Sequence, residues 1–580
     1  MEYSGGDIIA KVLKSHGVQH LFTLCGGHIS PILVGSKKMG IKIIDVRSEV
    51  HAVFAADAVS RMTGVPGVAV VTAGPGVTNS ITALKNAQMA QSPLILLGGA
   101  AATIIKGRGS LQDIDQTSLV KSCVKAALTI NRNCDIIPVM EQAFQTAQLG
   151  VPGPVFIECP IDLLYNEKLV REWYGSASGK SGRKGLKSKF FRFYLNHHVD
   201  RMFACDLNTV EPEPQGVKIP PLKSNKLVRA AQLIQKAKKP VLVIGSQTML
   251  HPDETAKLAS AVLKIGIPVY LTGMARGLLG ASGSIQMRHK RREALKNADL
   301  VMIAGMPCDF RLEYGRAINA KATFISINRS KSDLTLNRTP DLGIQTDPCL
   351  FLCSLAEKCG SKKNKWGPWI HTLQQNDEKR EEEIVKLSEE KTDFVNPLLF
   401  LKKLDRFLEE DSLIVADGGD FVASSSYILR PRTPLSWLDP GVFGTLGVGA
   451  GFAMGAKLSK PNSEVWLIYG DGAAGYSLQE FDTCVRHHIP IIAVVGNDAG
   501  WAQVARDQVE VLKDDVATNL NRTEYHRVVE GFGGKGFQIE HEDQILPILE
   551  EARNVAKGGT PVLINLLIGK TDFRKGSISM

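Results

Sequence analysis

The chain has 580 residues, of which 44% are apolar and 22% charged, and it carries a net charge of +10. This length is enough for about three or four domains, and this composition excludes disordered and fibrous proteins. The sequence holds no run of about 18 apolar residues and no signal-peptide core at its start, so we expect neither a transmembrane helix nor a secretory leader.

Short apolar strands alternate with helical patterns over about the first 170 residues. The candidate strands are 20–27, 41–47, 67–74 and 94–99. This alternation predicts a parallel sheet covered by helices on both faces. This region also contains the segments "CGGHISP" (25–31), "RSEVHAVFAADAVSRMTGVPGVAVVTAGPGVTN" (47–79) and "GSLQDIDQ" (109–116).

The next segment, 171–222, interrupts this pattern and predicts a basic linker or insertion. It contains six cations in a stretch without an acidic residue: Lys180, Arg183, Lys184, Lys187, Lys189 and Arg192. Phe190, Phe191, Phe193 and Tyr194 accompany them. A solvated linker and a contact with a membrane surface are both open interpretations. No nucleic-acid-binding module accompanies the patch, so we expect no nucleic-acid partner.

A second alternating region, 223–356, contains candidate strands 239–246, 299–306 and 323–328 and predicts a central α/β domain. The charged stretch 377–394 predicts a helical linker over 357–395, and a third α/β domain follows at 396–580. The ten cysteines form no C-x-x-C pair, and Cys349, Cys353 and Cys359 have helical spacing. We therefore expect buried thiols in a reducing compartment rather than a metal site.

In the last domain, an apolar strand ends in "YGDGAAGYS" (469–477). Asn497 and Asp498 follow Asp471 by 26 and 27 residues. One strand–helix–strand crossover brings two strand ends side by side, so both loops can hold one Mg²⁺ that also binds phosphate. Gly470, Gly472 and Ala473 would let backbone N–H groups approach that phosphate. Either Asn497 or Asp498 could be the second ligand, and Gly500 could add a backbone carbonyl.

This spacing resembles the metal–diphosphate motif of thiamine-diphosphate enzymes, and the resemblance covers nearly the whole chain. Segment 47–79 is similar to the pyrimidine-binding region of that family. The resemblance implies that Glu49 is the carboxyl that activates the cofactor, and that Gln112 and His28 line the active site. In "VFGTLGVGAGFAMGAK" (442–457), it implies that Leu446 bends the cofactor and that Gly444 offers a carbonyl to its aminopyrimidine ring.

For the fold, the resemblance implies α/β architecture with three doubly wound parallel-sheet domains. These are a pyrimidine-binding domain (1–170), a central domain (223–356) and a diphosphate- and Mg²⁺-binding domain (396–580). The implied cofactors are thiamine diphosphate and Mg²⁺. FAD is an open alternative because "CDFR" (308–311) is similar to the Asp-Asp-Arg of members that bind a flavin.

Two reactions are compatible with these motifs. We expect a lyase of fatty acid α-oxidation that cleaves a 2-hydroxyacyl-CoA to a shortened fatty aldehyde and formyl-CoA, because segment 291–315 resembles acyl-CoA-handling members. The positive net charge suits a CoA ligand. The alternative is acetolactate synthase-type joining of 2-keto acids, and a more remote one is a catalytically silent relative that only binds.

The resemblance also bears on assembly and location. It implies a homodimer or homotetramer in which Glu49 of one chain faces Asp471 of another. It further implies an intracellular protein associated with the endoplasmic reticulum membrane, with the cytoplasm as the alternative.

Overall fold

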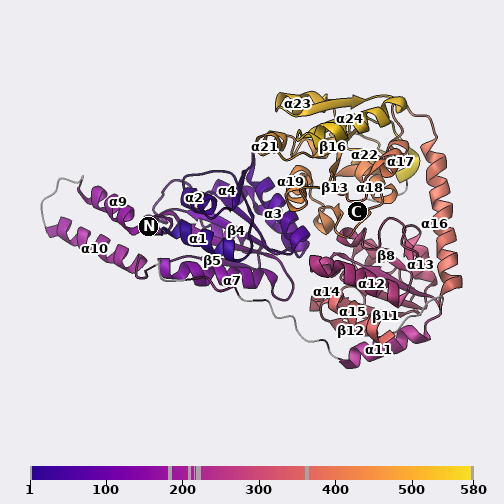
Figure 1. Ribbon diagram of the computed structural model, residues 1–580, viewed down its shortest axis with the longest axis horizontal. Helices are drawn as coiled ribbons and strands as arrows, with labels where there is room; N and C mark the ends of the chain where they lie inside the picture. The colour runs from indigo at the N-terminus through magenta and orange to yellow at the C-terminus, as the bar shows by residue number, and fades with distance from the viewer. Residues whose placement is uncertain are drawn as a thin grey trace. The chain divides into compact units, whose positions relative to one another are not determined.

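The computed structural model describes residues 3–179, 186–206, 211–214, 216, 222, 224–359 and 365–575. The chain divides into two compact units (Figure 1). Unit 1 comprises Met1–Ser60 and Val65–Lys218, and unit 2 comprises Arg61–Gly64 and Ile219–Met580. Three six-stranded sheets, one in unit 1 and two in unit 2, are parallel throughout the described residues, which confirms the predicted α/β fold class.

Unit 1 contains one sheet of strand order β2-β1-β3-β4-β6-β5. Its strands are β1 (His20–Thr23), β2 (Lys42–Asp45), β3 (Gly67–Val71), β4 (Leu94–Ala100), β5 (Ala126–Thr129) and β6 (Pro154–Pro160). Every residue of β3, β4 and β6 is buried, as expected for strands covered by helices on both faces.

The helices of this part of the chain occupy the connections between its strands and the segment after β6. They are α1 (Gly5–Ser15), α2 (Ser30–Lys38), α3 (Glu49–Thr63), α4 (Pro75–Asn79), α5 (Ile81–Met89), α6 (Gln116–Val120), α7 (Ile136–Gln148), α8 (Ile161–Leu164), α9 (Glu167–Gly179) and α10 (Leu186–Met202). Helices α9 and α10 lie side by side and extend away from the sheet of unit 1 (Figure 1). Much of the predicted basic linker is therefore helical.

Unit 2 contains the other two sheets. The central sheet has the order β12-β11-β10-β7-β8-β9, with β7 (Pro240–Ile244), β8 (Val269–Leu271), β9 (Gln286–Met287), β10 (Leu300–Ala304), β11 (Thr323–Asn328) and β12 (Leu342–Gln345). The third sheet has the order β14-β13-β15-β16-β18-β17, with β13 (Leu413–Asp417), β14 (Trp437–Leu438), β15 (Val465–Gly470), β16 (Ile492–Asn497), β17 (Lys535–Ile539) and β18 (Val562–Leu567).

Helices flank both sheets of unit 2. They are α11 (Ser224–Lys236), α12 (Thr255–Ile265), α13 (Arg291–Asn297), α14 (Lys331–Thr335), α15 (Pro348–Cys359), α16 (Gly367–Ser388), α17 (Pro397–Phe407), α18 (Gly419–Ile428), α19 (Gly449–Ser459), α20 (Asp471–Ala474), α21 (Glu480–Arg486), α22 (Ala502–Leu512), α23 (Tyr525–Gly531) and α24 (Ile545–Lys557). The long helix α16 lies within the predicted charged linker. None of the helices in the described residues is both long and apolar enough to cross a membrane.

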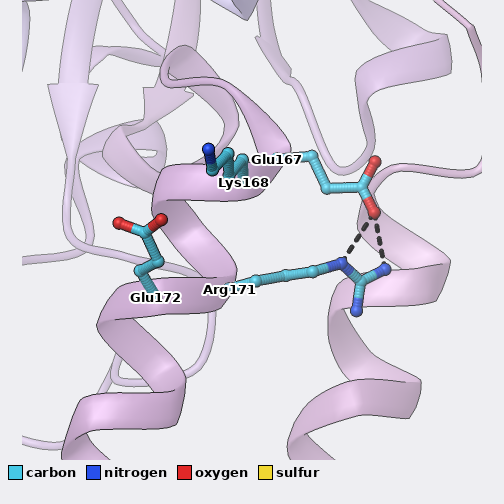
Figure 2. A pocket seen from close by; sticks show the side chains of 4 residues that line it. All are labelled: Glu167, Lys168, Arg171 and Glu172. Carbon is cyan, nitrogen blue, oxygen red and sulfur yellow. Dashed lines mark hydrogen bonds and ion pairs between the residues drawn. The ribbon is translucent and has the colours of Figure 1, made fainter.

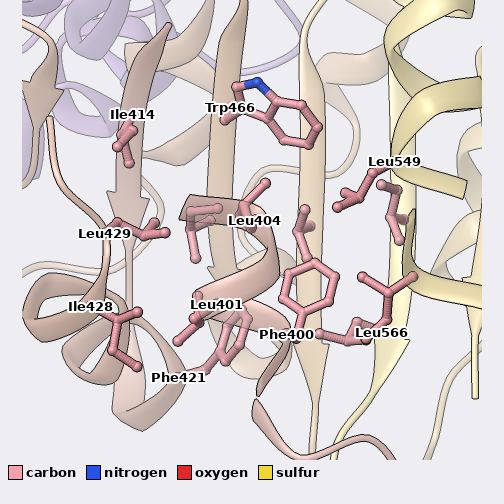
Figure 3. Close-up of a cluster of buried hydrophobic side chains, with 14 of the residues drawn as sticks. Phe400, Leu401, Leu404, Ile414, Phe421, Ile428, Leu429, Trp466, Leu549 and Leu566 are labelled. Atoms are coloured by element: carbon pink, nitrogen blue, oxygen red, sulfur yellow. The ribbon is translucent and has the colours of Figure 1, made fainter. Parts of the chain in front are cut away.

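The core of the third sheet fixes the strands that end at the candidate site. Figure 3 shows Phe400 and Leu404 of α17 packed against Trp466 of β15 and Leu566 of β18. These four side chains are at most 1% exposed, so the sheet is held by close packing from both the helix and the strands.

The expectation that the cysteines are reduced thiols is wrong for one pair. Cys134 and Cys205 form a disulfide, with Cα atoms 5.4 Å apart across 71 residues of sequence, so this pair does not consist of reduced thiols. The backbone of Cys205 also bonds the Asn133 side chain, accepting from Nδ2 at 2.6 Å and donating to Oδ1 at 3.3 Å. Cys349 and Cys353 are buried thiols, as the sequence predicts, whereas Cys359 is only partly buried; none of the three is in a disulfide.

Candidate active site

In unit 1, the structure brings His28 and Gln112 together through a residue that the sequence did not indicate. Thr72 directly follows β3, and its Oγ1 lies 3.3 Å from His28 Nδ1 and donates to Gln112 Oε1 at 3.4 Å. Because the hydroxyl has one proton, His28 Nδ1 must carry the proton of its own bond to Thr72, which leaves Nε2 as the accepting nitrogen. Burial lowers the pKa of His28, so its ring is neutral at physiological pH.

Backbone geometry keeps this cluster close. Gln112 adopts a left-handed φ of 62°, which is uncommon for a residue with a side chain. Gly74 has a φ of 63°, and a Cβ there would lie 2.8 Å from the carbonyl oxygen of Gln112. A Cβ on Gly26 would lie 2.4 Å from Thr72 Cβ. Glycine is therefore required where the loops after β1 and β3 approach the cluster.

Gln116 joins strand β4 to the loop after β3 at the same edge of the sheet. Its side chain is 1% exposed, its Oε1 accepts from Gly74 N at 3.3 Å, and its Nε2 donates to the Gly99 carbonyl at 2.8 Å. No sequence pattern indicates this role, because both partners of Gln116 are backbone groups, 42 and 17 residues away in the chain.

Glu49 begins α3 and is 6% exposed. Its Oε2 accepts a hydrogen bond from Asn79 Nδ2 at 3.1 Å. Asn79 ends α4, so the "GPGVTN" segment orients the carboxyl as well as supplying the glycine turn. Among the described residues, no hydrogen bond joins Glu49 to the His28, Thr72 and Gln112 cluster.

In unit 2, the loops after β15 and β16 meet as the sequence predicts. Asp471 follows β15, and its carboxylate accepts from Gly472 N at 2.7 Å and from Gly500 N at 3.1 Å. Burial raises the pKa of Asp471. Burial, together with the Asp471 and Asp420 carboxylates, raises the pKa of Asp498 to about 7. Two carboxyl groups that disfavour each other's charge are suited to a shared cation.

Asn497 and Asp498 have different surroundings. Asn497 is fully buried, and its Nδ2 donates to the Thr523 carbonyl and to Asn565 Oδ1, both at 3.1 Å. Its Oδ1 accepts from Ala499 N at 3.3 Å. The Asn497 side chain therefore ties strand β16 to β18, whereas Asp498 is the neighbour that interacts with Asp471.

The loop that contains Gly444 and Leu446 is shaped by Asp417 at the end of β13. The Asp417 carboxylate accepts from Gly447 N at 3.1 Å and from Gly449 N at 2.8 Å. Burial raises the pKa of Asp417 to about 7 although both amides donate to it. Leu446 Cδ2 lies 3.2 Å from the position of a Cβ on Gly418, and Gly444 (φ 64°) has open space around it. The sequence reasoning did not identify Asp417.

In the Gly-Asp-Gly turn (470–472), Gly470 has open space beside it, whereas Gly472 is covered by the Trp501 ring. A Cβ on Gly470 would meet no atom closer than 3.8 Å, whereas a Cβ on Gly472 would lie 2.4 Å from the Trp501 ring. Near this turn, Asp420 of α18 pairs with Arg506 of α22, with Nη2 and Oδ1 2.9 Å apart. A glycine cradle beside two carboxylates fits a diphosphate bridged by Mg²⁺.

A separate surface pocket carries no such chemistry. Figure 2 shows it lined by Glu167, Lys168, Arg171 and Glu172 of α9. Arg171 pairs with Glu167 and with Asp200 of α10, each at 2.6 Å. None of the sequence-predicted site residues lines this pocket. In the described residues, no group of three or more His, Cys, Asp or Glu side chains could hold a metal ion.

Three family models match the chain. Residues 3–119 match the N-terminal TPP binding domain of thiamine pyrophosphate enzymes, residues 227–355 the central domain, and residues 417–566 the C-terminal TPP binding domain. The first and last matches contain the two groups of candidate site residues, which we call the half-sites: the one with His28 and Glu49 in unit 1 and the one with Asp471 in unit 2. The middle match contains the central sheet.

Relatives are similar over nearly the full length. The chain is 50% identical to 2-hydroxyacyl-CoA lyase 2 of Danio rerio, over 99% of this chain and 93% of that protein. It is 45% identical to 2-hydroxyacyl-CoA lyase 2 of Homo sapiens, over 99% and 92%. It is 33% identical to a probable acetolactate synthase of Mycobacterium bovis, over 97% and 95%.

The bridge made by Gln116 yields a stability prediction. Gln116→Leu leaves Gly74 N–H and Gly99 C=O buried without partners, so the free energy of unfolding should fall by about 2–5 kcal/mol. Urea unfolding followed by circular dichroism measures this change. Gln148→Leu is the matched control, because Gln148 is partly exposed and bonds only the Phe144 carbonyl of its own helix. Equal effects of both substitutions would contradict the assigned role.

Proposed function

The chain belongs to the thiamine pyrophosphate enzyme family, and on that premise we propose that it is a lyase that cleaves a 2-hydroxyacyl-CoA to a shortened fatty aldehyde and formyl-CoA. The observation that carries this proposal is the identity of 45–50% to 2-hydroxyacyl-CoA lyases over 99% of the chain, against 33% to an acetolactate synthase. In the reaction, the bond between C1 and C2 breaks, C2 becomes the aldehyde, and the thioester carbon gains a hydrogen.

The cofactor would be held at its diphosphate end by unit 2. Asp471 and Asp498 would bind Mg²⁺, with the Gly500 carbonyl as a further ligand, and backbone amides of Gly470–Ala473 would face the diphosphate. Asn497 would act indirectly, because its side chain already bonds Thr523 and Asn565. Gly444 and Leu446 would contact the ring system. When bound, thiamine diphosphate accepts the electron pair released by C–C cleavage next to a carbonyl.

Residues of unit 1 would handle protons. The buried Glu49 carboxyl, oriented by Asn79, would exchange a proton with the aminopyrimidine ring. The neutral His28 ring, which offers Nε2 as an acceptor, is suited to take the proton of the substrate hydroxyl. Gln112, bonded to Thr72, would line the site beside it.

A cationic site in the central domain supports a CoA substrate. Arg291 is half-buried at the start of α13 and donates from Nη2 to the Arg311 carbonyl at 2.7 Å. Burial and the neighbouring Arg276 and Arg311 lower its pKa, and within the described part of the chain it has no carboxylate partner. Arg311 already pairs with Asp309. A guanidinium in this setting favours an added anion such as a phosphate of CoA.

FAD and reticulum association remain predictions from the resemblance. The Asp309 and Arg311 pair of "CDFR" is satisfied within its own loop, with Nη2 and Oδ2 2.6 Å apart. Flavin absorbance of the purified protein tests FAD binding, and cell fractionation tests the location.

The alternative of a catalytically silent relative is disfavoured because Glu49, Asp471 and Asp498 are all present.

We also propose that each active site is shared between two chains, with Glu49 of one facing Asp471 of the other. Apolar side chains are exposed beside both half-sites, with Leu111 next to Gln112 at 80% and Val511 and Leu512 of α22 at 75% and 70%. Helix α22 buries none of its residues within one chain. Such surfaces are typical of an interface between chains.

Glu49→Gln keeps the shape of the side chain but removes its acid–base function. Turnover should fall by about 10²–10⁴, while cofactor affinity changes much less. Exchange of the cofactor C2 proton with deuterated solvent, followed by NMR, should slow in parallel. Glu167→Gln, a surface carboxylate on α9, is the control. Normal proton exchange in Glu49→Gln would show that another group activates the cofactor.

Asp498→Ala and Asn497→Ala separate the metal ligand from the structural neighbour. Asp498→Ala should weaken binding of Mg²⁺ with thiamine diphosphate by about 10²-fold or more, with little loss of stability. Asn497→Ala should mainly lower the free energy of unfolding, by about 1–3 kcal/mol, because it leaves buried polar groups unpaired. Titration followed by the fluorescence of Trp501, which packs on the turn, reports the affinity. The reverse pattern would identify Asn497 as the ligand.

The substrate is tested by assaying purified protein with thiamine diphosphate and Mg²⁺ on 2-hydroxyacyl-CoA and on pyruvate. We expect formyl-CoA and aldehyde from the first and no acetolactate from the second. Arg291→Gln should raise KM for the CoA substrate by about 10–100-fold with little change in kcat, because a charge-assisted bond to phosphate is lost. Arg316→Gln, an exposed neighbour, is the control. Acetolactate formation at a comparable rate would favour the synthase.

Complementation tests the shared site. Glu49→Gln and Asp471→Ala should each be inactive alone, but random mixing of subunits gives mixed dimers in which one of two sites is intact. Recovery of about a quarter of the wild-type activity is expected. Sedimentation of the wild type should show a dimer or tetramer. A mixture that exchanges subunits and stays inactive would show that both residues act within one chain.

A further inference from the structure

Helix α10 has two faces of different character. Leu195, Val199 and Met202 are buried and attach the helix to the rest of unit 1. Phe190 and Phe193 lie elsewhere on the helix and are 74% and 69% exposed. Phe191 and Tyr194 are also exposed, at 50% and 48%. The rings of Phe193 and His197 stack at 6.4 Å. Phe193 and Tyr194 follow Phe190 by three and four residues on α10, so these aromatic residues share one face of the helix, the aromatic patch.

The base of this helix is firmly fixed. Asp162 Oδ2 accepts from Thr103 Oγ1 at 2.6 Å and from the Tyr174 hydroxyl of α9 at 2.7 Å. His198 Nε2 of α10 lies 2.8 Å from the same Thr103 oxygen. The Cys134–Cys205 disulfide attaches the chain just after the end of α10. Exposure of the aromatic patch therefore belongs to an anchored helix, and a role in packing within unit 1 does not account for it.

The charge around the patch has one sign. Arg192 lies among the aromatic residues of α10 and is exposed, and the sequence just before it contains Lys187 and Lys189. The sequence between Tyr174 and Val199 contains no acidic residue. A cationic, aromatic helix surface is complementary to an anionic lipid layer, where aromatic rings favour the interface and cations favour the headgroups.

We propose that the exposed aromatic face of α10 docks on an anionic membrane surface, with Phe190 and Phe193 entering the interface and Arg192 contacting lipid headgroups. Helices α9 and α10 protrude from unit 1 (Figure 1), so the patch can reach a flat surface without rearrangement of the sheet. The proposal does not depend on the reaction that the enzyme catalyses. It would bring the enzyme to the membranes in which long acyl chains partition.

The test is co-flotation of the full-length protein with phosphatidylcholine vesicles, with and without phosphatidylserine. We expect binding that requires phosphatidylserine and weakens as added salt shortens the screening length from about 10 Å to about 3 Å. Phe190→Ser with Phe193→Ser should reduce vesicle partitioning by about tenfold or more, because two apolar side chains no longer leave water. Both residues are exposed, so folding should be unaffected.

Two comparisons make the result specific. Leu263→Ser with Leu546→Ser removes two exposed apolar side chains, 48% and 50% accessible, from α12 and α24, and should leave partitioning unchanged. Replacing Lys187, Lys189 and Arg192 by Gln should abolish the preference for phosphatidylserine. No vesicle binding by the wild type would overturn the proposal. It would equally be overturned if the aromatic variant changed the oligomeric state in sedimentation, since the patch would then contact a second chain.

Discussion

The charge balance at the end of β15 is the constraint on which the candidate site depends. Asp471 and Asp498 are held side by side by backbone amides and burial, and neither forms an ion pair with a basic side chain in the described residues. Each carboxylate raises the cost of ionising the other. In the proposed function, a bound Mg²⁺ would offset this repulsion, and a diphosphate would complete its coordination. The amides of Gly472 and Gly500 donate to Asp471, and the Trp501 ring covers the Gly472 turn.

Parallel topology explains why so few residues can build each half-site. The carboxyl ends of adjacent strands meet at one edge of a sheet. In unit 1, the loops after β1, β3 and β4 converge there, and His28, Thr72 and Gln116 bond across them. In unit 2, the loops after β13, β15 and β16 converge in the same way. Small residues at the edge then decide how closely the loops can approach, as Gly26 shows by its fit against Thr72.

The sequence predicted most of the fold and part of the site, for identifiable physical reasons. Continuous apolar runs predicted the buried parallel strands, and the spacing from Asp471 to Asp498 predicted two neighbouring loops because one crossover has a nearly fixed length. The spacing could not choose between Asn497 and Asp498, since consecutive residues at a strand end point to opposite sides. The sequence did not identify four residues of the site, because their partners are backbone atoms or side chains distant in sequence. These residues are Thr72, Asn79, Gln116 and Asp417. The Cys134–Cys205 pair was missed for the same reason.

The two half-sites differ in electrostatic character, and this difference matches the proposed cofactor. The unit 1 cluster of His28, Thr72 and Gln112 is neutral and offers directional hydrogen bonds. The unit 2 cluster around Asp471 is dominated by carboxylates and backbone amides, which suit a metal and a diphosphate. Thiamine diphosphate is itself divided in this way, with a heteroaromatic ring at one end and charge at the other. The His28, Thr72 and Gln112 cluster offers no cation to the charged end, and the Glu49 carboxyl of the same unit disfavours an anion there. The pair of carboxylates in unit 2 would repel the charged end without its metal. In the proposed site shared between two chains, this division of polarity would favour one orientation of the cofactor.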